Sequence, residues 1–300
     1  MTPKDDIKNQ STAIVKERYT NDTVTSKDGT IIGYRQIGSG SGLVVLHGIM
    51  ESAQSHTQLA EALADSFTVY LPDRRGRGNS GSYGNDYNIQ REVEDIDALV
   101  TRTGAQYIFG VSMGAVISLQ AALTLTAIQK IALFDPPLII NGSVSTDFLA
   151  RYNEEISQGD IISALVTSMQ GSQMGPAIFN SMPRWLLAFL TKMMVTSEDK
   201  NAKSGDVTMR MLAPTLRYEL QLAIEVDGKQ ESFKNIQNKV LLLGTSNSPA
   251  YMKVALDALE KILPQSERIE FIGLNHGASG NTNRGGQPKR VAQELRRFFA

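Results

Sequence analysis

The chain has 300 residues, of which 41% are apolar and 20% charged. It is therefore long enough to bury one large α/β core or two ordinary ones, and its composition argues against general disorder. The 30 Lys and Arg against 31 Asp and Glu give a net charge of -1, so there is no electrostatic reason to expect a nucleic-acid partner. The absence of cysteine excludes disulfides, thiolate metal sites and cysteine nucleophiles.

The first 18 residues are polar and lack the apolar segment of a signal peptide. No part of the chain approaches the roughly 18 uninterrupted apolar residues of a membrane span. We therefore expect no membrane span and a soluble, cytoplasmic protein.

The predicted elements begin with two extended runs, 21–25 and 30–37, around the turn Asp28-Gly29. They read as a β-hairpin. The apolar run Leu43–Leu46 is typical of a strand buried on both faces of a parallel sheet. Strands and helices then alternate, which predicts a parallel sheet with helices on both faces. The expected strands are 67–71, 106–110, 130–134, 239–243 and 268–272, and the expected helices are 54–65, 89–103, 115–125, 251–262 and 288–299.

The alternation is interrupted after Pro136-Pro137. Residues 139–235 look mainly helical, show no strong strand and contain seven of the eleven methionines. We predict an α/β core made of residues 1–138 and 236–300, with residues 139–235 inserted as a helical cap.

The strongest chemical signal is Gly110-Val111-Ser112-Met113-Gly114, a G-x-S-x-G sequence between an expected strand and an expected helix. This is the context of a nucleophile elbow, a sharp strained turn that lifts the serine hydroxyl above the sheet edge. Side chains two positions either side would collide, which explains the glycines. The Met113 N–H begins the next helix, where developing negative charge is stabilised. The alternative is a tight turn with an idle serine.

Here the chain resembles the α/β-hydrolase superfamily, over roughly residues 20–138 and 236–300. His47-Gly48-Ile49 follows the third strand as the HG-x loop of that family does. Asp73–Gly81 is similar to its D-x-R-G-x-G-x-S loop, and Asn275-His276-Gly277 follows the last strand, where its catalytic histidine stands. The resemblance implies an eight-stranded, mostly parallel sheet with a cap after the sixth strand, and it makes the Ile49 N–H the second oxyanion donor.

A serine hydroxyl needs a base within hydrogen-bond reach to be a nucleophile at neutral pH. His276 is the expected base, because the order of serine, acid and histidine fits. In most of the family the acid follows the seventh strand, but Asn247 stands there, and an amide cannot carry the charge. A minority of the family place the acid after the sixth strand. We therefore assign Asp135 as the acid, with Asn247 as a possible helper; the alternatives are that Asp135 only caps the chain or that the triad is incomplete.

The remaining candidates are read as structural. His47 is expected to shape its loop, the arginines of the Asp73–Gly81 loop to hold loops in place, and His56 to be a surface or packing residue. The Gly38–Gly42 run precedes a strand, so it is no dinucleotide fingerprint. The chain has neither a phosphate-binding GxxxxGK[ST] loop nor a metal spacing such as HExxH. We expect no metal and no organic cofactor.

The inserted segment points to an apolar substrate. Methionine adapts to irregular apolar ligands, and residues 161–183 carry no charge. The alternative is that these side chains form only the core of the cap itself. The expected lining of the substrate pocket is Met50, Met169, Met174, Phe179 and Trp185.

The sequence thus predicts a serine hydrolase that cleaves a small or medium hydrophobic ester, thioester or lactone through an acyl-enzyme. The alternatives are a non-catalytic small-molecule-binding protein on the same fold, or a carbon–carbon hydrolase or haloperoxidase-like relative. The sequence does not indicate an oligomeric state.

Overall fold

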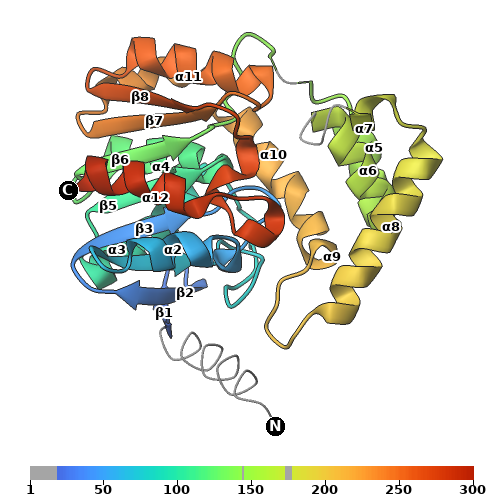
Figure 1. Ribbon diagram of the computed structural model, residues 1–300, viewed down its shortest axis with the longest axis horizontal. Helices are drawn as coiled ribbons and strands as arrows, with labels where there is room; N and C mark the ends of the chain where they lie inside the picture. Colours follow the sequence, from blue (N-terminus) through green and yellow to red (C-terminus); the bar gives the residue numbers. More distant parts are fainter. Residues whose placement is uncertain (1–18, 144, 173–177) are drawn as a thin grey trace, which may run out of the picture.

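The strands form one eight-stranded sheet, which is the body of the molecule in Figure 1. The computed structural model describes residues 19–143, 145–172 and 178–300. The strand order is β1-β2-β4-β3-β5-β6-β7-β8. β2 is antiparallel to β1 and β4, and the other neighbours are parallel. This confirms the predicted architecture. The strands are β1 (Thr20–Thr25), β2 (Ile31–Gly38), β3 (Ser41–Leu46), β4 (Phe67–Pro72), β5 (Tyr107–Val111), β6 (Lys130–Phe134), β7 (Lys239–Thr245) and β8 (Ser266–Phe271).

The predicted hairpin at the start of the sheet is confirmed. The Ser26 N–H donates to the Thr30 carbonyl at 2.8 Å, which closes the turn between β1 and β2. Gly29 lies within this turn at φ 87°, a conformation that a glycine adopts without steric cost.

The apolar runs of the central strands are buried on both faces of the sheet, as their composition predicts. In β3, Leu43 and Val45 join the cluster under α2 and α12, whereas Val44 and Leu46 join the cluster under α3, α4 and α11. The sheet is therefore the middle of three layers. The covering helices are α2 (Thr57–Leu63), α3 (Ile89–Thr103), α4 (Met113–Thr124), α11 (Ala250–Ile262) and α12 (Pro288–Phe299).

The chain between β6 and β7 is helical, as expected. Figure 1 shows α5 to α8 set to one side of the sheet, with α10 between them and the sheet. Leu222, Ala223 and Val226 of the α10 segment pack into the core cluster that also includes α3, α4 and α11. The exact bounds of core and cap stay a prediction. The helices are α5 (Leu149–Ser157), α6 (Ile161–Ser172), α7 (Ile178–Ser181), α8 (Arg184–Asn201), α9 (Met209–Leu212) and α10 (Leu216–Glu225).

The expected helix over residues 54–65 is divided. Its first turn is a 3-10 helix, η1 (Ala53–His56), and α2 follows it. The cause is local, because the Ser52 N–H donates to the Ser55 side chain at 3.2 Å while the Ser55 N–H donates back to the Ser52 carbonyl at 2.9 Å. Such paired bonds tighten the first turn.

Within the described ranges, no helix is both long enough and apolar enough to cross a membrane.

Candidate active site

Ser112 lies in a strained turn between β5 and α4. Its φ is 53° and its ψ is -121°, a conformation that costs a non-glycine residue on the order of 1–3 kcal/mol. A Cβ on Gly110 would lie 2.4 Å from the Gly114 carbonyl oxygen, and one on Gly114 would lie 2.2 Å from the Leu46 carbonyl oxygen. Any larger residue at position 110 or 114 would therefore collide with the neighbouring backbone, as the sequence predicts. The turn brings Ser112 to the wall of a cavity beneath the inserted helices.

Two backbone N–H groups beside Ser112 are free to bind an anion. Ile49 and Met113 line the same cavity as Ser112. In the part of the chain that the structure describes, neither N–H donates to a protein acceptor. Gly48 lets the Ile49 loop approach closely, because a Cβ on Gly48 would lie 2.7 Å from the Ser112 Cβ. This arrangement can stabilise negative charge on a carbonyl oxygen that Ser112 attacks.

His276 and Asp135 lie together, although 141 positions separate them in the chain. His276 begins a 3-10 helix, η4 (His276–Ser279), after β8. Its Nδ1 is 3.3 Å from Oδ2 of Asp135, which is fully buried at the end of β6. A buried carboxylate at Nδ1 fixes the ring orientation and leaves Nε2 to exchange a proton. Among the residues described, Ser112 and His276 share no hydrogen bond.

The side chains at and just after the end of β7 that contact Asp135 are hydroxyls. The Ser248 hydroxyl donates to Asp135 Oδ2, and Thr245 Oγ1 lies 3.4 Å from the same oxygen. Asn247, proposed from the sequence as a helper, is exposed, and its side-chain oxygen accepts a bond from Ser246 at 3.4 Å. That suggestion is therefore wrong. The sequence offers three hydroxyl residues in Thr245–Ser248, of which Thr245 and Ser248 contact Asp135.

His47 shapes its loop, as expected. It is fully buried, its Nδ1 donates to the Gly48 carbonyl at 3.0 Å, and its Nε2 accepts from the Arg74 N–H at 3.1 Å. One donor and one acceptor make this ring a neutral imidazole. Burial, together with Arg77 and Arg74, holds the pKa of His47 well below its usual value.

His56 is fully buried, which agrees with the packing alternative expected for it and not with the surface alternative. Both ring nitrogens contact polar partners, Glu51 and Ser279. The sequence did not indicate these polar partners, because Ser279 stands 223 residues further along the chain.

The arginines of the loop after β4 are buried in ion pairs. Arg74 donates to both oxygens of Glu92 and of Glu219, at 2.9 to 3.0 Å. Arg77 donates to Glu219 as well. Since Glu219 belongs to α10, this loop joins the sheet to the returning end of the inserted segment, which agrees with the structural role expected for it.

The cavity at Ser112 has a volume of about 600 Å³. Apolar side chains from the core and from the inserted helices supply most of its lining, and Met50 and Met169 are among them, as expected. Two charged residues also line it, Glu198 of α8 and Arg284 of the 3-10 helix η5 (Thr282–Arg284), with 4.0 Å between Glu198 Oε1 and Arg284 Nη2. Such a cavity is suited to a small apolar ligand with few polar groups.

Three further residues were expected in this lining. Met174 lies outside the described residues. Phe179 is half-buried on α7 and does not line the cavity. Its carbonyl oxygen accepts a hydrogen bond from the Gln170 side chain at 3.3 Å. Trp185 is 73% exposed and also stands outside the cavity. The expectation was wrong for Phe179 and Trp185.

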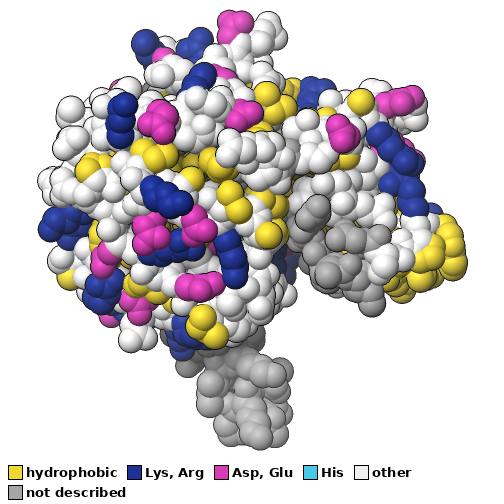
Figure 2. Space-filling model, turned by 90° about the horizontal axis from the view of Figure 1, so that it is seen from above, with side chains coloured by type: hydrophobic (Ala, Val, Ile, Leu, Met, Phe, Trp, Pro, Cys, Tyr) yellow, Lys and Arg dark blue, Asp and Glu magenta, His cyan; other side chains and the backbone are white. Residues whose placement is uncertain are grey.

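The position of Trp185 follows from the rotation of α8. Leu187, Thr191 and Val195 form the buried face of this helix, so Trp185 and Phe189 lie on the opposite face. Figure 2 shows hydrophobic side chains gathered at the outer edge of the molecule, on the side where Figure 1 places α8. The exposed large hydrophobic residues of α8 are Trp185, Phe189, Leu190, Met193 and Met194.

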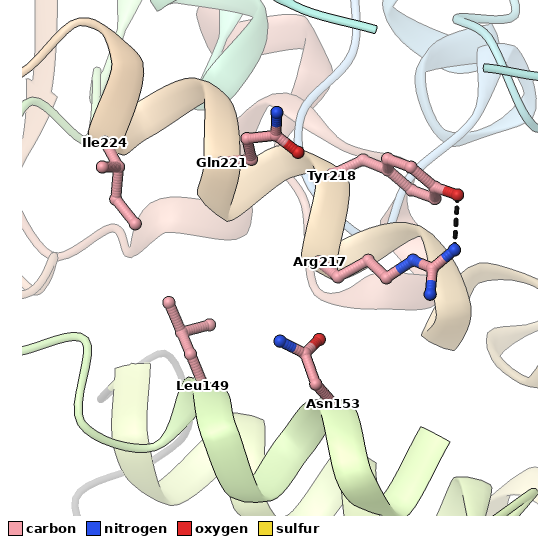
Figure 3. Close-up of a pocket in the computed structure, with 6 residues that line it drawn as sticks. All are labelled: Leu149, Asn153, Arg217, Tyr218, Gln221 and Ile224. Atoms are coloured by element: carbon pink, nitrogen blue, oxygen red, sulfur yellow. Dashed lines mark hydrogen bonds between the residues drawn. The ribbon is translucent and has the colours of Figure 1, made fainter. Parts of the chain in front are cut away.

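A second pocket, of about 470 Å³, lies between α5 and α10 (Figure 3). Asn153 of α5 faces Arg217 of α10, whose guanidinium carbon is 4.6 Å from the centre of the Tyr218 ring. Ile224 lines both this pocket and the cavity at Ser112, so the two hollows lie on either side of one side chain.

No three His, Asp or Glu side chains of the described ranges converge as the ligands of a metal ion would.

The match to a family model decides the family. The model described as "Alpha/beta hydrolase family" matches residues 43–294. This chain belongs to the alpha/beta hydrolase family. The match includes every residue assigned above to the serine, histidine and carboxylate site, and the eight-stranded sheet agrees with it.

Solved structures resemble this alpha/beta hydrolase over nearly its whole length. An alpha/beta hydrolase from Sphaerobacter thermophilus is 28% identical, with a TM-score of 0.75 over 93% of this chain and 100% of that one. An esterase from a Rhodococcus species is 20% identical, with a TM-score of 0.62 over 93% of this chain and 98% of that one. The second likeness shows the fold alone.

Curated relatives of this alpha/beta hydrolase match over a shorter stretch. An N-formylmaleamate deformylase from Pseudomonas putida is 34% identical over 105 residues, which is 34% of this chain and 39% of the relative. A soluble epoxide hydrolase from a Corynebacterium species is 35% identical over 85 residues, 27% of this chain and 30% of the relative. The chain thus matches only about a third of each relative's length, and the matched proteins carry different hydrolytic activities in their names.

Proposed function

We propose that this alpha/beta hydrolase is a serine hydrolase that cleaves small or medium hydrophobic esters, thioesters or lactones through an acyl-enzyme. The observation that carries the proposal is a serine in a strained turn that lines one cavity together with two residues whose N–H groups have no protein acceptor among the described residues. A histidine held by a buried carboxylate after the neighbouring strand supports it. Each group has a distinct part in acyl transfer.

In the proposed mechanism, Ser112 Oγ attacks the substrate carbonyl while His276 Nε2 takes its proton. The Ile49 and Met113 N–H groups hold the resulting oxyanion. His276 then gives the proton to the leaving group, and the acyl group stays on Ser112. Water, activated by His276, releases the acid and restores the serine. Asp135 keeps the ring oriented and stabilises its charged form throughout.

The missing bond between Ser112 and His276 is compatible with this mechanism, because catalytic hydrogen bonds are often long without substrate and shorten in the complex. The apolar lining with Met50 and Met169 supports a hydrophobic acyl or alcohol group. The segment 139–235 would act as the cap over this group. The 34% identity to a deformylase over part of the chain also makes N-formyl amides worth assaying beside esters.

The test is the intact mass after incubation with a fluorophosphonate at neutral pH, with Ser112→Ala beside the wild type. One adduct on the wild-type protein and none on Ser112→Ala is the expected result. No adduct on folded wild-type protein would contradict the proposal and favour a ligand-binding protein. Nitrophenyl esters of increasing acyl length then test the substrate class, with a preference for medium apolar chains expected.

A further inference from the structure

A polar pair, the partly exposed Glu51 and the buried His56, lies between the two loops that carry the proposed chemistry. His56 ends η1 and is fully buried. Its Nε2 is 3.1 Å from Oε2 of Glu51, and its Nδ1 is 3.2 Å from the carbonyl oxygen of Ser279. Neither residue takes part in the mechanism described above.

The partners of His56 fix its protonation. A carboxylate and a carbonyl oxygen are both acceptors, so each ring nitrogen must carry a hydrogen for the two bonds to form. The ring is then an imidazolium, next to the negative charge of Glu51. His47, only nine positions earlier, differs in this respect, since its Nε2 accepts a bond from the Arg74 N–H.

Each residue of the pair also forms a hydrogen bond with the backbone of one of the two loops. The same Glu51 Oε2 accepts the Gly48 N–H at 2.8 Å, immediately before Ile49. At the other end, Ser279 closes η4, the short helix that His276 begins. A chain of three hydrogen bonds therefore runs from the oxyanion loop through Glu51 and His56 to the loop of the general base.

We propose that the His56 imidazolium, paired with Glu51, is a positioning residue that holds the oxyanion loop and the His276 loop in a fixed position relative to each other. The inference rests on the proposed function, because it concerns the alignment of those two loops for acyl transfer. Deprotonation of His56 removes one ring hydrogen, so one of its two bonds is lost and one loop is released.

The charges around the pair favour the ionised form. Burial acts to lower the pKa of His56, but the Glu51 carboxylate and its hydrogen bond raise it above the usual value, against the opposing charge of Arg284. Burial acts to raise the pKa of Glu51, but His56, the Gly48 N–H and His47 lower it. The guanidinium of Arg77 also donates to the Glu51 carbonyl at 3.1 Å. Because the pKa of His56 is raised, the relative position of the two loops is kept at neutral pH and lost at alkaline pH.

The first test is the pH dependence of phosphonylation of Ser112 by a fluorophosphonate, with ester hydrolysis measured in parallel. For the wild type we expect a fall in rate at alkaline pH. In His56→Gln, which cannot titrate, this alkaline fall should disappear. We expect its plateau value of kcat to be about 10- to 100-fold lower at nearly unchanged KM, since misplaced oxyanion donors act on the transition state.

Glu51→Gln removes the negative charge of this side chain and nearly keeps its size. Its side-chain oxygen can still accept the Gly48 N–H, but the negative charge beside His56 is gone. Burial then dominates, so the alkaline fall should move to lower pH. Asn281→Ala is the matched control, because Asn281 docks the same loop through neutral bonds to the Gln54 carbonyl and the Gln58 N–H, at 2.7 and 2.9 Å. It should lower the rate without moving the alkaline fall.

A direct measurement does not depend on activity. Two-bond ¹H–¹⁵N correlation spectra of the folded wild-type protein should show His56 with both nitrogens protonated at neutral pH and His47 with one. A neutral His56, or an alkaline fall that persists unchanged in His56→Gln, would overturn the inference. A wild-type protein that is inert to the fluorophosphonate would instead contradict the proposed function, and the spectra would still decide the charge of His56.

Discussion

At the scale of single residues, the proposed site takes its carboxylate from Asp135 and not from position 247. Asp135 has no exposed surface, touches His276 and accepts the Ser248 hydroxyl. Asn247, the residue before Ser248, is exposed. The two positions therefore offer a comparison within one chain.

Asp135→Asn should lower kcat for ester hydrolysis by about 10³- to 10⁴-fold, because an amide favours the wrong tautomer of the histidine and cannot stabilise its charged form. Asn247→Ala should change kcat less than about twofold, since the side chain has no contact with the site. Steady-state kinetics on one nitrophenyl ester, with thermal melts to confirm folding, measure both. Activity of Asp135→Asn within a few-fold of wild type would remove Asp135 from the mechanism.

Sequence reasoning predicted Ser112, Asp135 and His276. The first two directly follow β5 and β6, His276 stands in the segment after β8, and the carboxyl ends of parallel strands meet at one sheet edge. The same reasoning did not find Thr245, Ser248, Glu51 or the role of His56. Their contacts depend on side-chain rotamers and on how distant loops pack, and short polar residues in loops leave no periodic pattern for either.

At the scale of elements, α8 has two faces of opposite character. Leu187 is 1% exposed on the inner face, whereas Trp185 is 73% exposed on the outer one. The sequence places both in an apolar helix but cannot fix which face turns inward, because apolar residues surround the first turns of α8. The rotation is set by packing against α6 and α9.

Leu187→Ala should lower the free energy of unfolding by about 2–4 kcal/mol, because it opens a cavity in the cap. Trp185→Ala should change it by less than about 0.5 kcal/mol and leave kcat/KM for a nitrophenyl ester unchanged. Denaturant titrations followed by circular dichroism, together with ester kinetics, compare the two. Loss of ester binding in Trp185→Ala would instead put the indole in the substrate path.

At the scale of the whole molecule, two glutamates of the inserted segment form ion pairs with the sheet domain. Glu219 of α10 is fully buried between Arg74 and Arg77. Glu198 of α8 faces Arg284 across 4.0 Å at a partly exposed position. Burial makes the two ion pairs of Glu219 costly to break, whereas water and salt screen the pair of Glu198.

Glu219→Gln should destabilise the protein by about 3–5 kcal/mol, since two buried arginines lose their shared counter-charge. Glu198→Gln should cost at most about 1 kcal/mol, and less in high salt. Urea denaturation at low and high ionic strength distinguishes them. Equal, small effects from both substitutions would mean that the buried charges around α10 are solvated in solution.

The placement of the insertion also has a consequence for how the chain folds during synthesis. β6 receives its outer neighbour, β7, only after residues 135–238 have been made. At ribosomal rates of about 5–20 residues per second, β6 is the edge of an incomplete sheet for roughly 5–20 s. The edge is apolar, and unpaired apolar edges recruit other strands. We therefore expect the nascent chain to be most prone to aggregate in this interval, and the last two strands, β7 and β8, to end it.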